Sequence, residues 1–133
     1  MILYLDTSGK TAKVWLDENY AEFALDRNMA KELLGKIDAF LEQHHSTWHQ
    51  LTGLALMKGA GSFTGLRIGA SILNAVASSE KIPIVGEKTT ANVNDDGGEK
   101  WRMAAKKRLL EGHNDKIVVP FYQKEANITQ PKR

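Results

Sequence analysis

The segment Ser8-Gly9-Lys10-Thr11 has the residue types of a phosphate-binding loop. A Walker A loop also needs a glycine five residues before Gly9, so that backbone amides can surround the phosphates. Tyr4 occupies that position, inside an apolar run that predicts a strand. The glycine-rich segment 59–64 lacks the third glycine of a dinucleotide-binding fingerprint, since Thr64 stands in its place. Neither segment predicts a nucleotide cofactor, and we expect no cofactor site.

The apolar run ends in an acidic residue followed by two hydroxyl side chains, Asp6-Thr7-Ser8. This order is similar to the one that actin-like kinases use to hold magnesium and phosphate at a strand end, but the same residues can simply order a turn. A nuclease of the ribonuclease-H type would need clustered carboxylates, for which only Glu87, Asp95 and Asp96 are candidates. One alternative therefore stays open, a stand-alone actin-like Mg-ATP-binding phosphotransferase or ATPase that uses Asp6 and Thr7.

Histidines are the main remaining candidates for metal binding, because the chain has no cysteine. His45 and His49 are four residues apart, with His44 beside them, near the expected end of a helix. Imidazoles at that position interact favourably with the last carbonyl groups of a helix. We interpret these residues as a helix end and predict no metal site.

The composition describes one globular domain. The chain has 133 residues, of which 42% are hydrophobic, with 18 Lys and Arg against 16 Asp and Glu. A chain of this length can bury a core without disulfides or metals. Its apolar start, Met1–Leu5, runs directly into Asp6 and is too short for a secretion signal. We expect a cytoplasmic protein that does not bind a membrane.

The excess of basic side chains lies in the second half of the chain. Five of them fall in one segment that is expected to be helical, and they make an RNA-binding module a third hypothesis, beside the simpler interpretation of a solvated face. They are Lys100, Arg102, Lys106, Lys107 and Arg108.

The hydrophobic pattern predicts an α/β fold: a mixed five-stranded ribonuclease-H-like (actin-like) sheet flanked by helices. Continuous apolar runs indicate strands that pair in parallel, and alternating runs indicate an antiparallel hairpin. Pro83 argues against a central place for the fifth strand. The expected elements are strand Ile2–Leu5, a hairpin over 12–16 and 21–25, helix Asn28–His44, strand Leu54–Met57, helix Thr64–Ser79 with Ser62 or Thr64 as its cap, and strand 82–86. A linker over 92–98, a basic helix over Glu99–Leu110, a last strand near Ile117–Tyr122 and a frayed tail complete the prediction.

Both longer helices carry more apolar surface than one buried stripe needs. In the first helix, Ala30 and Leu34 widen the arc, so that it can face two neighbours. The second helix combines Ile68 and Ile72 with many small residues, Gly65 and Gly69 among them. Small residues let another backbone approach closely, and that backbone can belong to the sheet or to a helix of another protein.

The run Lys58–Gly69, together with Leu3–Ser8 and Ile82–Gly86, closely resembles the bacterial TsaB (YeaZ) family. The family signature is Gly-Pro-Gly-Ser-Phe-Thr-Gly-Leu-Arg-Ile-Gly, and the residues from Gly61 to Gly69 agree throughout. Ala60 replaces the loop proline. The stretch from Leu33 to Asp38 also resembles the family's first helix, and 119–124 resembles its closing segment.

The resemblance implies an actin-like fold and a non-catalytic subunit in the synthesis of threonylcarbamoyladenosine (t6A) in tRNA. It implies docking to a catalytic paralogue, TsaD, through the first two helices, a TsaE-like ATPase in a larger complex, a homodimer when the partner is absent, and contact with tRNA only through the partner. Glu87 and Ala91 stand where the paralogue has two metal-binding histidines. The family has a second lobe, so residues 1–91 are expected to form the actin-like domain and 92–133 a remnant of that lobe, in a shortened form. The residues that we expect to contact the partner are Leu33, Ile37, Phe40, Leu66, Arg67, Ala70 and Asn74.

Overall fold

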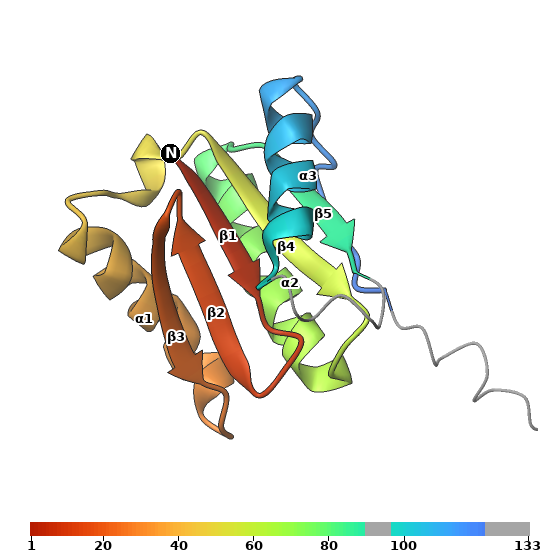
Figure 1. Ribbon diagram of the computed structural model, residues 1–133. Helices are drawn as coiled ribbons and strands as arrows, with labels where there is room; N and C mark the ends of the chain where they lie inside the picture. The colour runs from red at the N-terminus through yellow and green to blue at the C-terminus, as the bar shows by residue number, and fades with distance from the viewer. Residues whose placement is uncertain (90–96, 122–133) are drawn as a thin grey trace, which may run out of the picture.

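The fold is a single mixed sheet with helices on both of its faces (Figure 1). The computed structural model describes residues 1–89 and 97–121. Its strands lie in the order β3-β2-β1-β4-β5. The strands are β1 Ile2–Asp6, β2 Thr11–Leu16, β3 Asn19–Ala24, β4 Gly53–Gly59 and β5 Ile84–Lys88. The helices are α1 Met29–Gln43, the short 3-10 helix η1 Trp48–Gln50, α2 Phe63–Glu80 and α3 Glu99–Leu110.

The strand pairing follows the two kinds of apolar run. β1 and β4 are nearly continuous apolar segments and pair in parallel, with Leu3 opposite Leu54, and β4 pairs in parallel with β5. β2 and β3 alternate and form the antiparallel hairpin, whose turn contains Asp17 at a φ of 53°. The expected mixed five-stranded sheet is confirmed, and Pro83 immediately precedes β5, which is an edge strand.

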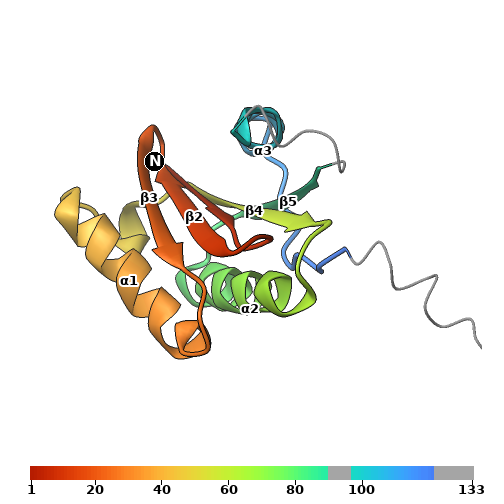
Figure 2. The ribbon, with the colours of Figure 1, turned by 60° about the horizontal axis from the view of Figure 1, so that its bottom comes forward.

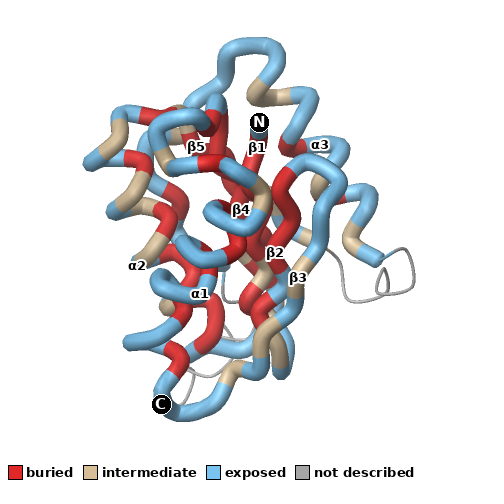
Figure 3. The backbone as a smooth tube through the Cα atoms, turned by 90° about the vertical axis from the view of Figure 1, so that its left-hand side faces the viewer, coloured by how far each residue is buried: buried red, intermediate tan, exposed pale blue. Residues whose placement is uncertain are grey.

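Three helices cover the sheet unequally (Figure 2). α1 and α2 lie under one face, where their apolar side chains join those of β1, β2 and β4 in the main core. α3 lies on the opposite face, over β4 and β5. A second, smaller core forms there around Trp101, which is 3% exposed and meets Tyr4 and Trp15 edge to face. Burial is concentrated in the central strands and on the inner sides of α1 and α2 (Figure 3).

The final strand expected near Ile117–Tyr122 is wrong over its described part, since residues 117–121 are not a strand. The neighbouring residues do reach the free edge of β5, with one backbone hydrogen bond, from the Asp115 N–H to the Ile84 carbonyl at 2.7 Å, and otherwise with side chains. The backbone N–H of Ile84 donates to Asn114 Oδ1 at 3.1 Å, and that of Gly86 donates to Asp115 Oδ2 at 2.9 Å. Because side chains accept from these two N–H groups, no strand ladder forms along this edge, and residues 117–121 are not a strand.

The other expected boundaries hold within a few residues. α2 begins at Phe63 because Ser62 is its N-cap, and the hydroxyl of Ser62 accepts a hydrogen bond from the backbone N–H of Gly65 at 3.3 Å. The basic helix over 99–110 agrees with α3. Of the linker expected over 92–98, residues 92–96 lie outside the described residues, and so does the tail from residue 122. No helix among the described residues is long and apolar enough to span a membrane.

Candidate functional site

Five of the seven residues expected to contact a partner lie instead in the core of this chain. Each is at most 4% exposed, and all except Leu66 pack in the main core with residues of the sheet. The expectation chose the strongest apolar stripe of each helix, and that stripe is the one that a helix buries against its own sheet. The corrected residues are Leu33, Ile37 and Phe40 on α1 and Leu66 and Ala70 on α2.

The other two residues, Arg67 and Asn74, differ in whether they contact the rest of the chain. Arg67 is exposed, and its guanidinium lies 5.2 Å from the centre of the Phe63 ring. Asn74 binds the chain's own backbone: its Oδ1 accepts from the N–H of Val118 at 2.8 Å, and its Nδ2 donates to the carbonyl of Val118 at 2.9 Å. Arg67 is available to a partner, whereas Asn74 fixes the segment beside β5.

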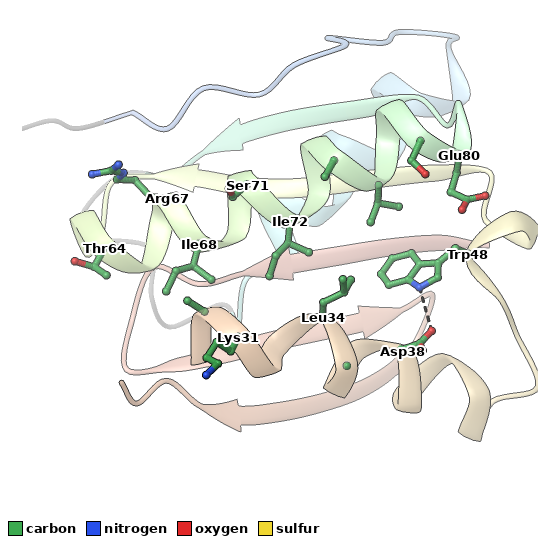
Figure 4. Close-up of a pocket in the computed structure, with 15 residues that line it drawn as sticks. Lys31, Leu34, Asp38, Trp48, Thr64, Arg67, Ile68, Ser71, Ile72 and Glu80 are labelled. Atoms are coloured by element: carbon green, nitrogen blue, oxygen red, sulfur yellow. Dashed lines mark hydrogen bonds between the residues drawn. The ribbon is translucent and has the colours of Figure 1, made fainter. Parts of the chain in front are cut away.

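The outer sides of α1 and α2 enclose a groove of about 1050 Å³. Figure 4 shows the two helices running side by side, with Leu34, Ile68 and Ile72 directed into the space between them. Leu34 is 46% exposed. Small residues separate these side chains, so the groove is open to a second backbone. They are Ala30 and Gly35 on α1 and Ser71 and Ala75 on α2.

The two ends of the groove carry opposite charge. Lys31 and Arg67 lie at the end where both helices begin (Figure 4). Asp38 and Glu80 lie at the other end, where the indole N–H of Trp48 donates to Asp38 Oδ1 at 3.1 Å. Glu80 also pairs with His49, Nδ1 to Oε1 at 2.5 Å. The groove is therefore apolar along its length, positive at one end and negative at the other.

The glycines of α2 serve the sheet and not the groove. A methyl group added at Gly65 or Gly69 would lie closer than 3.0 Å to an oxygen of Thr7. The Thr7 hydroxyl donates to the carbonyl of Gly65 at 2.6 Å, and Thr7 is 0% exposed. Of the two backbones that a small-residue surface can admit, the glycines of α2 admit that of β1.

The hydroxyls that an ATPase would need are occupied within the fold. Thr7 is buried against α2, as described above, and cannot reach a phosphate. Both the hydroxyl and the backbone N–H of Ser8 donate to Asp6 Oδ1, at 2.6 and 2.9 Å. These contacts match the interpretation of Asp6-Thr7-Ser8 as a structural turn.

Glu87, which the resemblance puts where the paralogue has a histidine, belongs to a structural ion network. The Arg108 guanidinium contacts Glu87 at 3.1 Å, the carbonyl of Gly86 at 3.2 Å, and Asp115. Burial acts to raise the pKa of Asp115, but hydrogen bonds from Arg108 and from the Gly86 N–H outweigh it and hold the pKa below its usual range. Within residues 1–89 and 97–121, no three His, Cys, Asp or Glu side chains form a group that could hold a metal.

Some of the groove residues that were not expected to contact a partner nevertheless have a signal in the sequence. Leu34 and Ile72 are part of the apolar surface that is left over when each helix has buried one apolar stripe. Such a surplus is the signal that a helix faces two neighbours. Trp48 comes from η1, and no periodicity could place a residue of a three-residue helix at the end of this groove.

The sequence of this chain is similar to those of known proteins from one pathway. A family model described as "TsaD: tRNA N6-adenosine threonylcarbamoyltransferase" matches residues 24–93, more than half of the chain. The protein called tRNA threonylcarbamoyladenosine biosynthesis protein TsaB from Buchnera aphidicola subsp. Schizaphis graminum is 33% identical over 121 residues, which cover 88% of this chain and 56% of that protein. The Escherichia coli protein of the same name is 27% identical over 133 residues, covering 95% and 56%.

The solved structure of YeaZ from Pseudomonas aeruginosa superposes with a TM-score of 0.61 at 20% identity, covering 74% of this chain and 48% of that one. This likeness shows a shared fold. The chain spans about half the length of the relatives it matches. The chain therefore belongs to the family that this model describes, and the curated relatives that it resembles carry the name TsaB.

Proposed function

We propose that this chain is a non-catalytic scaffold subunit that docks a TsaD-like catalytic protein and supports t6A modification of tRNA in the cytoplasm. The observation that carries the proposal is the groove between α1 and α2, which is preformed, apolar and lined by small residues. The names of the relatives supply the pathway.

The groove has the properties of a surface that another helix covers. Packed helices approach to about 8–10 Å between their axes when small residues lie at the contact. Leu34, Ile68 and Ile72 would become buried, which supplies the apolar core of an interface. A partner held along α1 and α2 would keep its own site in one shape, so the subunit would raise the rate of the reaction by preorganisation.

The same groove also fits a second copy of this chain. A two-fold axis across the middle of the groove would bring Lys31 and Arg67 of one copy opposite Asp38 and Glu80 of the other. We therefore expect a homodimer when the catalytic partner is absent, and exchange to a heterodimer when it is added. A TsaE-like ATPase would join that heterodimer, and the catalytic partner would bind tRNA.

A catalytic role for this chain has less support. The side chains that an ATPase would use, those of Asp6 and Thr7, already bond within the chain, and Glu87 is paired with Arg108. We therefore assign the chemistry to the partner.

The test uses a substitution in the groove and a matched one on the opposite side of the sheet. Leu34→Asp places a charge in the groove, whereas Met103→Asp makes the same kind of change at a 63% exposed position of α3. Burying a whole leucine side chain contributes about 1.5–3 kcal/mol. Leu34 has roughly half of its surface left to bury, and an unpaired buried carboxylate adds to the loss. We expect Leu34→Asp to weaken binding to a TsaD-like protein by at least about tenfold.

Binding is measured by calorimetry and by light scattering after size-exclusion chromatography, and t6A formation is measured in the reconstituted system. Met103→Asp should bind as the unchanged chain does. Equal binding by both variants would show that the groove is not the docking surface. Leu66→Asp is unsuitable for this purpose, because Leu66 is 1% exposed and the change would unfold the chain.

A further inference from the structure

The groove between α1 and α2 is small for a complete docking surface. It is lined by 15 residues. Each side of a stable and specific protein interface contains about 20–30 residues and buries about 800 Å². A protein that docks stably in the groove therefore covers additional surface beyond one of the two helices.

The surfaces beyond the two helices differ in polarity. The exposed residues of α1 that do not line the groove are mostly charged or polar: Glu32, Lys36, Ala39, Glu42 and Gln43. Beyond α2, a second hollow of about 620 Å³ begins at Ala75, which lines the groove as well. Interface cores are depleted in charged residues, so the surface beyond α2 is the better continuation of the groove.

The second hollow lies between α2 and residues 114–121, which we call the edge segment. Its apolar lining includes Ala75, Ile82 and Ile117, and the Ile117 side chain is the exposed one among them that is large, at 67%. Lys81 and Lys116 also line the hollow, and no acidic residue does within the described part of the chain. The hollow is therefore apolar and basic.

Ile117 is held in its exposed position by the backbone on both sides of it. The N–H of Asp115 donates to a carbonyl of β5 at 2.7 Å, and the N–H of Phe121 donates to a carbonyl of β4 at 2.6 Å. Between these two anchors, Val118 is 3% exposed and belongs to the main core. None of these contacts involves Asn74, so the edge segment keeps its place when the Asn74 side chain is replaced.

We propose that the docking surface continues from the groove over α2 to the edge segment, and that the second hollow binds an apolar side chain of the TsaD-like partner with a carboxylate beside it. The exposed residues of α2 between the two hollows are small, Ala75 and Ser78 among them, so they do not obstruct a helix that lies across α2. Lys81 and Lys116 favour an acidic partner surface.

A second copy of this chain is a poorer occupant of the second hollow. Each copy carries the same two lysines there, and the chain has a net charge of +2. The inference rests on the proposed function, because it extends the surface to which the catalytic partner is assigned.

The experiment compares two variants of the edge segment, Ile117→Asp and Val119→Asp. Val119 is the matched control, because it is 68% exposed, lies two residues further along the same segment and lines neither hollow. Binding to a TsaD-like protein is measured by calorimetry, self-association by light scattering, and folding by Tm. We expect Ile117→Asp to weaken docking at least about tenfold and Val119→Asp to change it by no more than about twofold. Ile117→Ser, which removes the apolar contact without adding a charge, replaces Ile117→Asp if the charge lowers Tm.

The acidic character of the partner is tested by Lys116→Glu, with Lys106→Glu on α3 as the control of equal charge change. Lys106 lies on the opposite face of the sheet from the groove (Figure 2). Lys116→Glu should lower the rate constant of association with the TsaD-like protein by about threefold or more at low salt, and less at high salt. Equal rate constants for the two variants would overturn the acidic chemistry assigned to the partner.

The outcomes separate this inference from the proposed function. If Ile117→Asp and Val119→Asp dock equally well while Leu34→Asp docks weakly, the inference is overturned and the groove remains the docking surface. If Leu34→Asp docks as the unchanged chain does, it is the proposed function that fails. If Ile117→Asp abolishes self-association and leaves docking unchanged, the second hollow belongs to a contact between copies, and the inference is again overturned.

Discussion

A substitution of Gly65 by alanine tests whether the glycines of α2 serve the sheet. The added methyl group would lie closer than 3.0 Å to the backbone carbonyl oxygen of Thr7, at the end of β1. Alanine in place of an interior helical glycine stabilises a helix by about 1 kcal/mol. Overpacking costs about 1–3 kcal/mol or more, and the upper part of that range applies because the neighbour is main chain beside a central strand. We expect a net loss of about 2 kcal/mol in the free energy of unfolding.

Gly35→Ala is the matched control. Gly35 lies within α1, and no heavy atom outside its own helix backbone and chain neighbours would come within 4 Å of the added methyl group. Only the helix propensity then changes, and the free energy of unfolding should increase by about 1 kcal/mol. For a chain of this size, 1 kcal/mol shifts Tm by about 3–4 °C. The two variants should therefore move Tm in opposite directions, Gly65→Ala down by about 6–8 °C and Gly35→Ala up by about 3–4 °C.

The assay is urea unfolding followed by tryptophan fluorescence, with Tm from calorimetry. A Gly65→Ala variant that is as stable as Gly35→Ala would refute the close packing of α2 on β1. If that stable variant also failed to dock a partner, the glycines would belong to the interface and the two sides of α2 would be assigned wrongly.

Two further predictions concern the segment after α3. Asn74→Ala should lower the free energy of unfolding by about 2 kcal/mol, because it removes both hydrogen bonds to Val118, and it should leave partner docking unchanged. Stability is measured by urea unfolding and docking by calorimetry. A variant of full stability that docks more weakly would show that Asn74 contacts the partner. Asp115, whose pKa is held low in the folded chain, stabilises the fold above the carboxyl's unfolded pKa and loses that contribution as the pH falls below about 4 and through the folded value. Asp115→Asn should therefore reduce the loss of stability between about pH 4 and lower pH. A variant whose stability falls with pH as steeply as that of the unchanged chain would contradict the role given to the Asp115 carboxylate.

The sheet could be predicted from the sequence because its strands differ in a visible way. The continuous apolar runs of β1 and β4 require helices on both faces, and the alternation in β2 and β3 requires only one covered face. Pro83 placed β5 at an edge through its missing N–H. These signals are local, because each is contained in the residues of its own strand or directly before it.

The end of the sheet at β5 could not be predicted in the same way. The run around Val118 looks like a strand, and Val118 is in fact buried. Whether this run pairs with β5 depends on Asn114 and Asp115, whose side chains bind the edge of β5. It also depends on Asn74, which lies 44 residues away from Val118 in the sequence and binds its backbone. The strand propensity of a single residue does not report this competition, in which side chains and backbone groups bind the same donors and acceptors.

The expected partner-contact residues proved to be core residues for a related reason. A helix that faces both a sheet and a partner carries two apolar stripes, and the stripe against the sheet is stronger because it sustains the fold without the partner. The second stripe must stay soluble when uncovered, so it uses fewer large side chains and more small ones: here Ala30, Ser71 and Ala75 lie beside Leu34 and Ile72. Ranking residues by apolar character therefore selects the core. A candidate interface is found from what remains after the core has been assigned, and Leu34→Asp is expected to disrupt docking without unfolding the chain.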